Sequence, residues 1–188
     1  MVLSKEHLRH CLRKRIAGKS WPGRNRFSTA ASSLQKKNGE GVFNGRKGYG
    51  CQWGLLVDSS GKPLGAVVGN GSQNERTLVG PCLDSLPKEL RKKIDVMLAD
   101  GGFYSKPLTM QLRDEYDINL IAPPYKNVKN RFQDGRCLRR LKRRWPVERT
   151  IAWLKTHSRL AKRRDLLQTS YLGFLHLACC LILLGRFY

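Results

Sequence analysis

A carboxylate in the last third of the chain is surrounded by cations at spacings that suit phosphate chemistry. Glu148 follows Pro146, a residue favoured at the first position of a helix, so we expect Glu148 in the first helical turn. Lys155 comes seven residues later, about two turns on and therefore on the same face, and Arg144 precedes the helix near that face. On spacing alone, an ordinary solvated helix with a salt bridge is the more common arrangement.

A second carboxylate stands at the end of a short apolar run. Ile94–Ala99 is typical of a buried strand, and Asp100 follows it directly. Gly101 and Gly102 come next, and their lack of side chains would let a large ligand approach the backbone closely. Asp100 is therefore a candidate ligand or a residue that caps the following turn, and the sequence leaves both readings open.

The charge balance indicates the class of partner. The chain of 188 residues has 36 Lys and Arg against 14 Asp and Glu, a formal net charge of +22. A polyanion relieves such self-repulsion, so nucleic acid is the expected partner and anionic lipid the main competitor. Ribosomal and histone-like proteins have the same balance, so charge alone does not indicate the chemistry. Two basic runs, 139–144 and 162–164, flank the Glu148 helix.

Hydrophobic residues make up 40% of the chain, which is enough for one domain with a buried core. The six cysteines form no C-x-x-C pair and the N-terminus is charged, so we expect reduced thiols in a cytoplasmic, nucleoid-associated protein. The apolar stretch Tyr171–Leu184 is shorter than the roughly 20 residues that span a bilayer, so we expect a buried helix and no membrane contact. His7, His10 and Cys11 lie close together, but without a second ligand pair they do not predict a metal site.

Strands and helices alternate along the chain, which predicts an α/β layer fold. A basic loop is expected from Tyr125 to about Arg144. The expected elements are a hairpin over Cys51–Gly69 turning at Asp58–Gly61, a helix over Asn74–Leu86, a strand over Ile94–Ala99, a helix capped by Ser105 and ending near Tyr116, a strand over Ile118–Ala122, a helix from Pro146, and a final apolar helix.

The segment around Glu148 resembles a signature of DDE transposases of the insertion-sequence four/five type, in which Tyr, Arg, Glu and Lys occur as Y-x2-R-x3-E-x6-K. Arg144, Glu148 and Lys155 fall in register, while Leu141 stands at the Tyr position. The resemblance extends over about residues 36–184. It includes the hairpin segment 55–65, Glu75-Arg-Thr-Leu, the segment 99–105 around Asp100, and the final helix.

The resemblance implies a ribonuclease-H-like mixed sheet flanked by helices, in which three acidic residues hold two divalent metal ions, usually Mg²⁺. Asp100 would be the second acid and Glu148 the third, both catalytic and metal-binding. The implied partner is double-stranded DNA, at the element ends and the target, and a homo-oligomer is possible. The cations implied to contact the DNA backbone are Arg144 and Lys155, with Lys142, Arg143, Arg140 and Arg139 beside them, and the run 162–164 is implied to line the same DNA groove.

The first acid of the family is missing from its expected place. Phe27–Gln35 occupies the position of the opening strand and contains no acid, and the Asp position falls at about Thr29–Ala31. Asp58, in the hairpin turn, and Glu40 are poor substitutes. We therefore expect residues 1–35 to form a basic arm that does not match the family, residues 36–188 to form the catalytic domain, and the sheet to be incomplete at its N-terminus.

Two functions follow from these observations. The first is metal-dependent DNA cleavage and strand transfer in transposition, impaired because the first Asp is absent. The second is a non-catalytic basic DNA- or RNA-binding protein, including a transposase remnant. The match of Asp100 and Glu148 to the family pattern favours descent from an active transposase. The missing first acid favours nucleic-acid binding without catalysis as the function of this chain.

Overall fold

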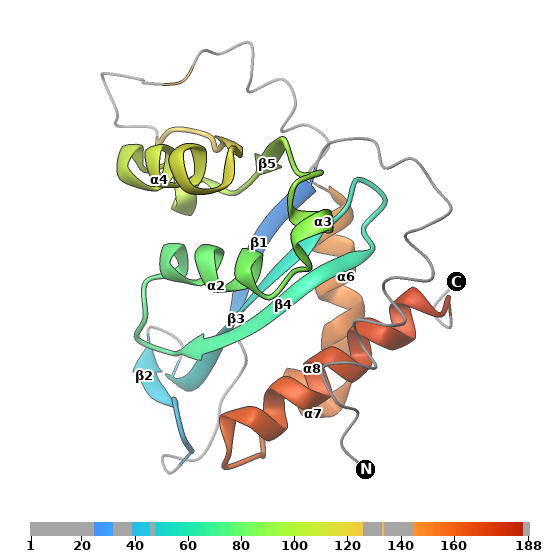
Figure 1. Ribbon diagram of the computed structural model, residues 1–188. Coiled ribbons are helices and arrows are strands. Elements are labelled where there is room, and N and C mark those ends of the chain that lie inside the picture. The colour runs from blue at the N-terminus through green and yellow to red at the C-terminus, as the bar shows by residue number, and fades with distance from the viewer. Residues whose placement is uncertain (1–24, 32–38, 46–47, 126–132, 134–144, 186–188) are drawn as a thin grey trace.

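One mixed sheet with helices on both faces forms the fold (Figure 1). The computed structural model describes residues 25–31, 39–45, 48–125, 133 and 145–185. The strands are β1 (Asn25–Ala31), β2 (Phe43–Gly45), β3 (Gly48–Val57), β4 (Pro63–Asn70), β5 (Val96–Leu98) and β6 (Asn119–Ile121).

Strand β1 lies in the middle of this sheet. It pairs antiparallel with β3, with Phe27 opposite Leu56, and parallel with β5, with Arg26 opposite Leu98. β4 pairs antiparallel with the other edge of β3, and β6 pairs parallel with β5. The strands are therefore ordered β4-β3-β1-β5-β6, and β2 pairs with the first residues of β3.

The position of β1 corrects the expectation of a sheet that lacks its opening strand. Residues 25–31 lie within the predicted basic arm, yet they form a strand paired on both edges. Phe27 is the only large apolar residue in β1, so the alternating pattern that marks a strand in sequence is absent. Pairing with neighbouring strands stabilises β1 instead. Gly54 of β3 leaves room for the Phe27 ring, because a Cβ there would lie 2.8 Å from the ring Cζ.

The helices are η1 (Glu75–Leu78), α2 (Val79–Asp84), α3 (Lys88–Arg91), η2 (Gly101–Phe103), α4 (Lys106–Tyr116), α6 (Trp145–Thr156), α7 (Ser158–Ala161) and α8 (Gln168–Leu183). The predicted helix over Asn74–Leu86 is present as η1 followed by α2. Ser105 stands at the N-cap of α4 as predicted, but its side chain makes no capping hydrogen bond. The predicted hairpin and both later strands are confirmed.

Different helices cover the two faces of the sheet (Figure 1). Leu56 and Phe27 pack against α2, α3 and α4 on one face. Trp53, Leu55 and Val57 pack against α6, α7 and α8 on the other. Alternate residues of a strand project to opposite sides, so β3 supplies side chains to both cores.

The cysteines within the described residues are Cys51, Cys82, Cys179 and Cys180, and all four are free thiols, as predicted for them. Burial raises the pKa of Cys82 to about 12 and also raises the pKa of Cys179. Across the described part of the chain, no helix is both long enough and apolar enough to cross a bilayer. His7, His10 and Cys11 lie outside the described residues.

Candidate functional site

Asp100 lies at the surface, two residues after the end of β5, and caps the turn that follows. Its side chain is exposed and accepts a hydrogen bond of 2.6 Å from the backbone N–H of Gly101. The backbone N–H of Phe103 in turn donates to the Asp100 carbonyl at 2.9 Å. The capping reading of Asp100 is therefore confirmed, and the same geometry leaves the carboxylate at the surface, where a ligand could reach it.

Arg76, which the sequence analysis did not single out, holds the loop after Asp100 in place. Its Nε donates to the Gly102 carbonyl at 2.8 Å, and one terminal nitrogen donates to the Tyr104 carbonyl at 3.5 Å. Arg76 comes from η1, far from Asp100 in sequence. The only sequence signal was its place in the Glu75-Arg-Thr-Leu segment, and its hydrogen bonds give this cation a structural role.

Glu148 lies in the first turn of α6, as predicted, and its side chain is exposed. Lys155 is also exposed, in the last turn of the same helix. Ala152 lies between them and is exposed as well, whereas Val147 and Leu154 are fully buried. Glu148 and Lys155 therefore share the outer side of α6, in agreement with the helical spacing of the sequence.

The hairpin turn between β3 and β4 supports the first turns of α6. The Thr150 hydroxyl donates to the Gly61 carbonyl at 2.6 Å, and the Arg149 guanidinium donates to the Ser60 carbonyl at 2.8 Å. Gly61 has a positive φ of 89°, and a Cβ there would lie 3.1 Å from the Pro146 carbonyl oxygen. The close fit between turn and helix fixes where α6, and with it Glu148, sits against the sheet.

Asp58 organises this turn. The buried carboxylate accepts from the Ser60 backbone N–H and hydroxyl at 2.8 and 2.7 Å, and from the Lys62 backbone N–H at 2.8 Å. These bonds give the Asp58 carboxylate a structural role in the turn. Glu40, the other substitute considered, accepts a 3.0 Å bond from the Gln168 backbone N–H at the start of α8.

The basic residues expected to contact DNA fall into three groups. Arg139, Arg140, Lys142, Arg143 and Arg144 lie outside the described residues. Lys162 and Arg164 are exposed, as expected of phosphate-binding cations. Arg163, in contrast, is buried, which corrects the expectation that it contacts DNA.

The Arg163 side chain is only 1% exposed, and its guanidinium lies 5.4 Å from the centre of the Tyr171 ring. It donates to the carbonyls of Asp165 and Leu166 at 3.0 and 3.1 Å. Arg163 therefore holds the α7–α8 connection together and cannot line a DNA groove. A run of basic residues in the sequence does not reveal which of the side chains is buried.

The donor set does not fit the metal site that the family resemblance implies. Across the described residues, no group of three His, Cys, Asp or Glu side chains is arranged to hold a metal ion. β1, the opening strand, contains no acid. The two acids expected from the resemblance, Asp100 and Glu148, are one fewer than the three that the resemblance implies.

Comparisons of the sequence with known proteins identify its family. Residues 18–183 match the family described as transposase DDE domain. A putative transposase for insertion sequence element IS402 of Burkholderia cepacia is 34% identical over 139 residues, which cover 71% of this chain. The match spans only 62% of the length of that relative.

Solved structures give the same picture at the level of the fold. The piggyBac transposase synaptic complex with hairpin DNA aligns with a TM-score of 0.50 at 14% identity, covering 92% of this chain and 48% of that one. The Mos1 strand transfer complex aligns with a TM-score of 0.33 at 9% identity, covering 93% and 57%, and that score is too low to bear on the fold.

Proposed function

Since this chain belongs to the family of transposase DDE domains, we propose that it is the DNA-handling core of an insertion-sequence transposase whose strand-cleaving activity is impaired. In this proposal Asp100 and Glu148 are the remaining members of the acidic set. Lys155 on α6 contacts the DNA backbone, together with Arg144, Arg143, Lys142, Arg140 and Arg139 from the preceding basic run.

The order of the strands supports a ribonuclease-H-like sheet. Three antiparallel strands, β4, β3 and β1, are followed by two strands parallel to β1. Asp100 follows the first of those parallel strands, which pairs with β1, and Glu148 is on α6, which packs against β1 and β3. These places support the proposal that Asp100 and Glu148 are the second and third acids.

The lack of an acid on β1 carries the proposal of impairment. The family implies divalent metal ions, usually Mg²⁺, bound by oxygen ligands. Two carboxylates provide less charge and less orientation than three, so we derive no metal-dependent step for this chain. The chain retains cations that can bind a DNA backbone, and its net charge of +22 favours that binding.

The sheet register supports a narrower position for the absent acid than the sequence does. Arg26 is opposite Leu98 in the parallel β1–β5 pair, so two residues further along, position 28 is level with Asp100. Neighbouring positions of parallel strands project from the same face. We therefore place the missing carboxylate at Ser28, one residue before the range Thr29–Ala31 expected from the sequence.

Restoring that carboxylate is the direct test. Supercoiled plasmid is incubated with Mg²⁺ or Mn²⁺ and the wild-type chain, the Ser28→Asp variant, or the double variant Ser28→Asp with Glu148→Gln. We expect no nicking by the wild type, nicking by Ser28→Asp, and loss of nicking in the double variant. Ser28→Asn is the matched control, because it adds a similar volume without a charge.

Nicking by the wild-type chain that Glu148→Gln abolishes would contradict the impairment, since it would mean that a third ligand exists. The second candidate function, nucleic-acid binding without catalysis, is favoured by the absence of acid on β1 and predicts that Ser28→Asp also fails. Binding is measured separately as affinity for duplex DNA against salt concentration. Lys155→Ala should lower the salt slope by about one, and Lys88→Ala on α3, the control, should not.

A further inference from the structure

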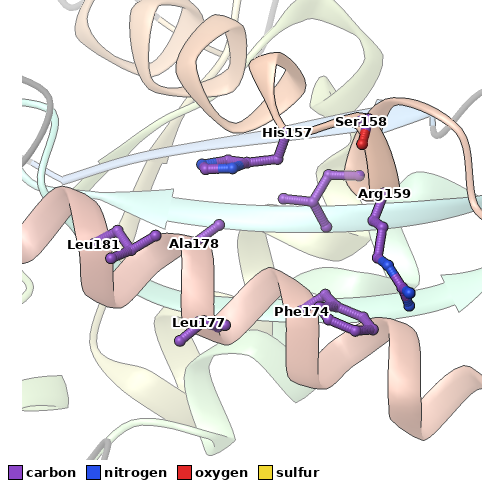
Figure 2. Close-up of a pocket in the computed structure, with 8 residues that line it drawn as sticks. His157, Ser158, Arg159, Phe174, Leu177, Ala178 and Leu181 are labelled. Atoms are coloured by element: carbon purple, nitrogen blue, oxygen red, sulfur yellow. The ribbon is translucent and has the colours of Figure 1, made fainter.

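Two features of the described surface lie outside the proposed function. One is a cavity of about 180 Å³ between α7 and α8, lined on α8 by Phe174, Leu177 and Leu181 (Figure 2). Leu177 is 42% exposed, so the expected buried helix is buried on one side only. The other feature is polar. Gln133, from the expected basic loop, forms hydrogen bonds with the outer edge of β6.

Gln133 binds the edge of β6 as a neighbouring strand would. Its side-chain Nε2 donates to the Leu120 carbonyl at 2.8 Å, and its Oε1 accepts from the Ala122 backbone N–H at 3.2 Å. The inner edge of β6 faces β5, because the Ala99 N–H donates to the Ile121 carbonyl at 3.0 Å. β6 is the last strand of the described sheet order. The carboxamide therefore satisfies one acceptor and one donor that an edge strand would leave open.

This edge lies at the end of the sheet where Asp100 follows β5. Neighbouring strands are about 4.8 Å apart, so the Gln133 amide, outside β6, is roughly 10 Å from the line of β5. The chain leaves β6 against the turn after Asp100, since a Cβ at Gly101 would lie 3.4 Å from the Pro123 carbonyl oxygen. Gln133 therefore returns the basic loop to the sheet near the Asp100 carboxylate.

The start of the loop is attached at the same end. A terminal nitrogen of Arg76 donates to the Tyr125 hydroxyl at 3.4 Å, and its Nε donates to the Gly102 carbonyl of η2 at 2.8 Å. Tyr125 and Gln133 are thus both bonded to elements around the Asp100 turn. The chain between them is the segment 126–132, which contains three Lys and Arg and no acid.

We propose that Gln133 is a positioning residue, whose side chain docks the basic loop on the β6 edge and so presents the loop's cations to DNA beside Asp100. This inference rests on the proposed function. Residues 126–144 contain nine Lys and Arg and one acid. Docking at Gln133 divides the 19 residues between Tyr125 and Trp145 into spans of 7 and 11. Shorter free spans lose less conformational entropy when their cations bind phosphates, so docking strengthens DNA binding.

Amide hydrogen exchange, followed by NMR, tests the docking without DNA, so this result is independent of the proposed function. Gln133→Leu removes both hydrogen bonds. We expect the Ala122 N–H to exchange about tenfold faster in this variant, as for the loss of one hydrogen bond. Gln111→Leu, at an exposed position of α4, is the matched control and should leave the exchange unchanged. An Ala122 N–H that exchanges at the wild-type rate in Gln133→Leu would overturn the proposal.

Affinity for duplex DNA across a series of salt concentrations tests the positioning. Gln133→Leu should bind about tenfold more weakly at 0.1 M salt, with a salt slope lower by about one, the effect of losing roughly one phosphate contact. Gln111→Leu should bind like the wild type. Faster exchange with unchanged DNA affinity would overturn the positioning role, because docking would then serve the sheet edge alone. A wild-type chain that does not bind DNA would overturn the proposed function and the positioning together, and the exchange result would distinguish that failure from a loss of docking.

A carboxyl group at the same position separates hydrogen bonding from packing. In Gln133→Glu the ionised carboxylate faces the Leu120 carbonyl, whereas the protonated form has an O–H that can donate to it. At neutral pH this variant should bind DNA about as weakly as Gln133→Leu. At about pH 4.5 it should regain most of the wild-type affinity, because a facing carbonyl favours the protonated form. The wild type and Gln111→Glu are measured at both pH values, and a deficit of Gln133→Glu that acid does not reduce would contradict the role of the two hydrogen bonds.

Discussion

The helices on the two faces of the sheet are held to it by different kinds of interaction. On the α2–α4 face the contacts are apolar, as in the edge-to-face pair of Phe27 and Phe103 with ring centres 5.3 Å apart. On the α6–α8 face the apolar core is joined by buried polar contacts. The Thr150 hydroxyl of α6 donates to the Gly61 carbonyl of the hairpin turn, and within the helical layer the Tyr171 hydroxyl of α8 donates to the Leu160 carbonyl of α7 at 3.0 Å.

The difference is greatest along β4, which pairs with β3 alone among the described strands. Two side chains of α8 reach its backbone: the Gln168 amide donates to the Val68 carbonyl at 2.9 Å, and a ring nitrogen of His176 lies 3.1 Å from the Ala66 carbonyl oxygen. An uncovered edge strand invites pairing with other chains. The α6–α8 layer therefore protects the sheet edge as well as packing on its face, and directional bonds suit that task.

Neighbouring leucines of β3 test whether the two cores are equally important for stability. Leu55 faces the α6–α8 side and Leu56 the α2–α4 side, and both are 0% exposed. We expect each change to alanine to lower the free energy of unfolding by about 2–5 kcal/mol, because each leaves a cavity in a dry core. Urea denaturation measures both. A cost below about 1 kcal/mol for Leu55→Ala alone would mean that polar contacts, and not packing, hold the α6–α8 layer.

Arg163 provides the next largest effect. Arg163→Ala should lower the free energy of unfolding by about 2–4 kcal/mol, because it removes the guanidinium donor from the Asp165 carbonyl and one of two donors from the Leu166 carbonyl, and it uncovers the Tyr171 ring. The neighbouring exposed cations, Lys162 and Arg164, are matched controls, and their alanine variants should change stability by less than about 0.5 kcal/mol. Among variants that remain folded, Lys162→Ala and Arg164→Ala should lower the affinity for duplex DNA more than Arg163→Ala does. If Arg163→Ala were as stable as the controls, the α7–α8 connection would not depend on this residue.

The contact between the hairpin turn and α6 should be worth less. Thr150→Val removes a buried hydroxyl that donates to the Gly61 carbonyl, and we expect a loss of about 1–2 kcal/mol in unfolding free energy. Thr156→Val, at the exposed end of the same helix, makes the same chemical change and should cost about 0.5 kcal/mol or less. Equal losses would show that the turn does not fix α6.

Two buried thiols, one on each side of the sheet, should have the smallest effect on the free energy of unfolding. This effect should be seen only at alkaline pH. The pKa of Cys82 is raised from 9.0 to about 12 in the folded chain, and that of Cys179 is raised as well. Above pH 9 the unfolded thiols lose protons that the folded ones keep. The stability from each is therefore complete below pH 9 and falls as pH rises toward 12 by up to about 1.4 kcal/mol per pH unit.

Denaturation of the wild type and of Cys82→Ala at a series of pH values isolates this contribution. The difference between the two chains should be constant below pH 9 and shrink above it. A difference that does not change with pH would mean that the α2 side of the sheet admits water. The same comparison with Cys179→Ala tests the α8 side.

Local patterns were enough to predict most of the elements and their types. The turn residues Asp58–Gly61 between two apolar runs indicated the hairpin, and Pro146 indicated the start of a helix that begins at Trp145. The same patterns placed Asp100 at a strand end and Glu148 and Lys155 on one side of a helix. These features depend on neighbours in sequence, through turn chemistry and helical periodicity, so they can be read without knowing the rest of the fold.

The sequence by itself therefore determined the family resemblance, the basic character, and the absence of an acid from the opening segment. Only the tertiary structure decided that Asn25–Ala31 is the central strand, because its stability comes from pairing with β3 and β5 and not from its own composition. It also decided that Arg163 is buried while Arg164 is exposed, that Arg76 supports the loop after Asp100, and that one side of α8 is left open. Each of these depends on contacts between residues far apart in the chain, and a charge or an apolar side chain does not reveal in sequence which partner it will meet.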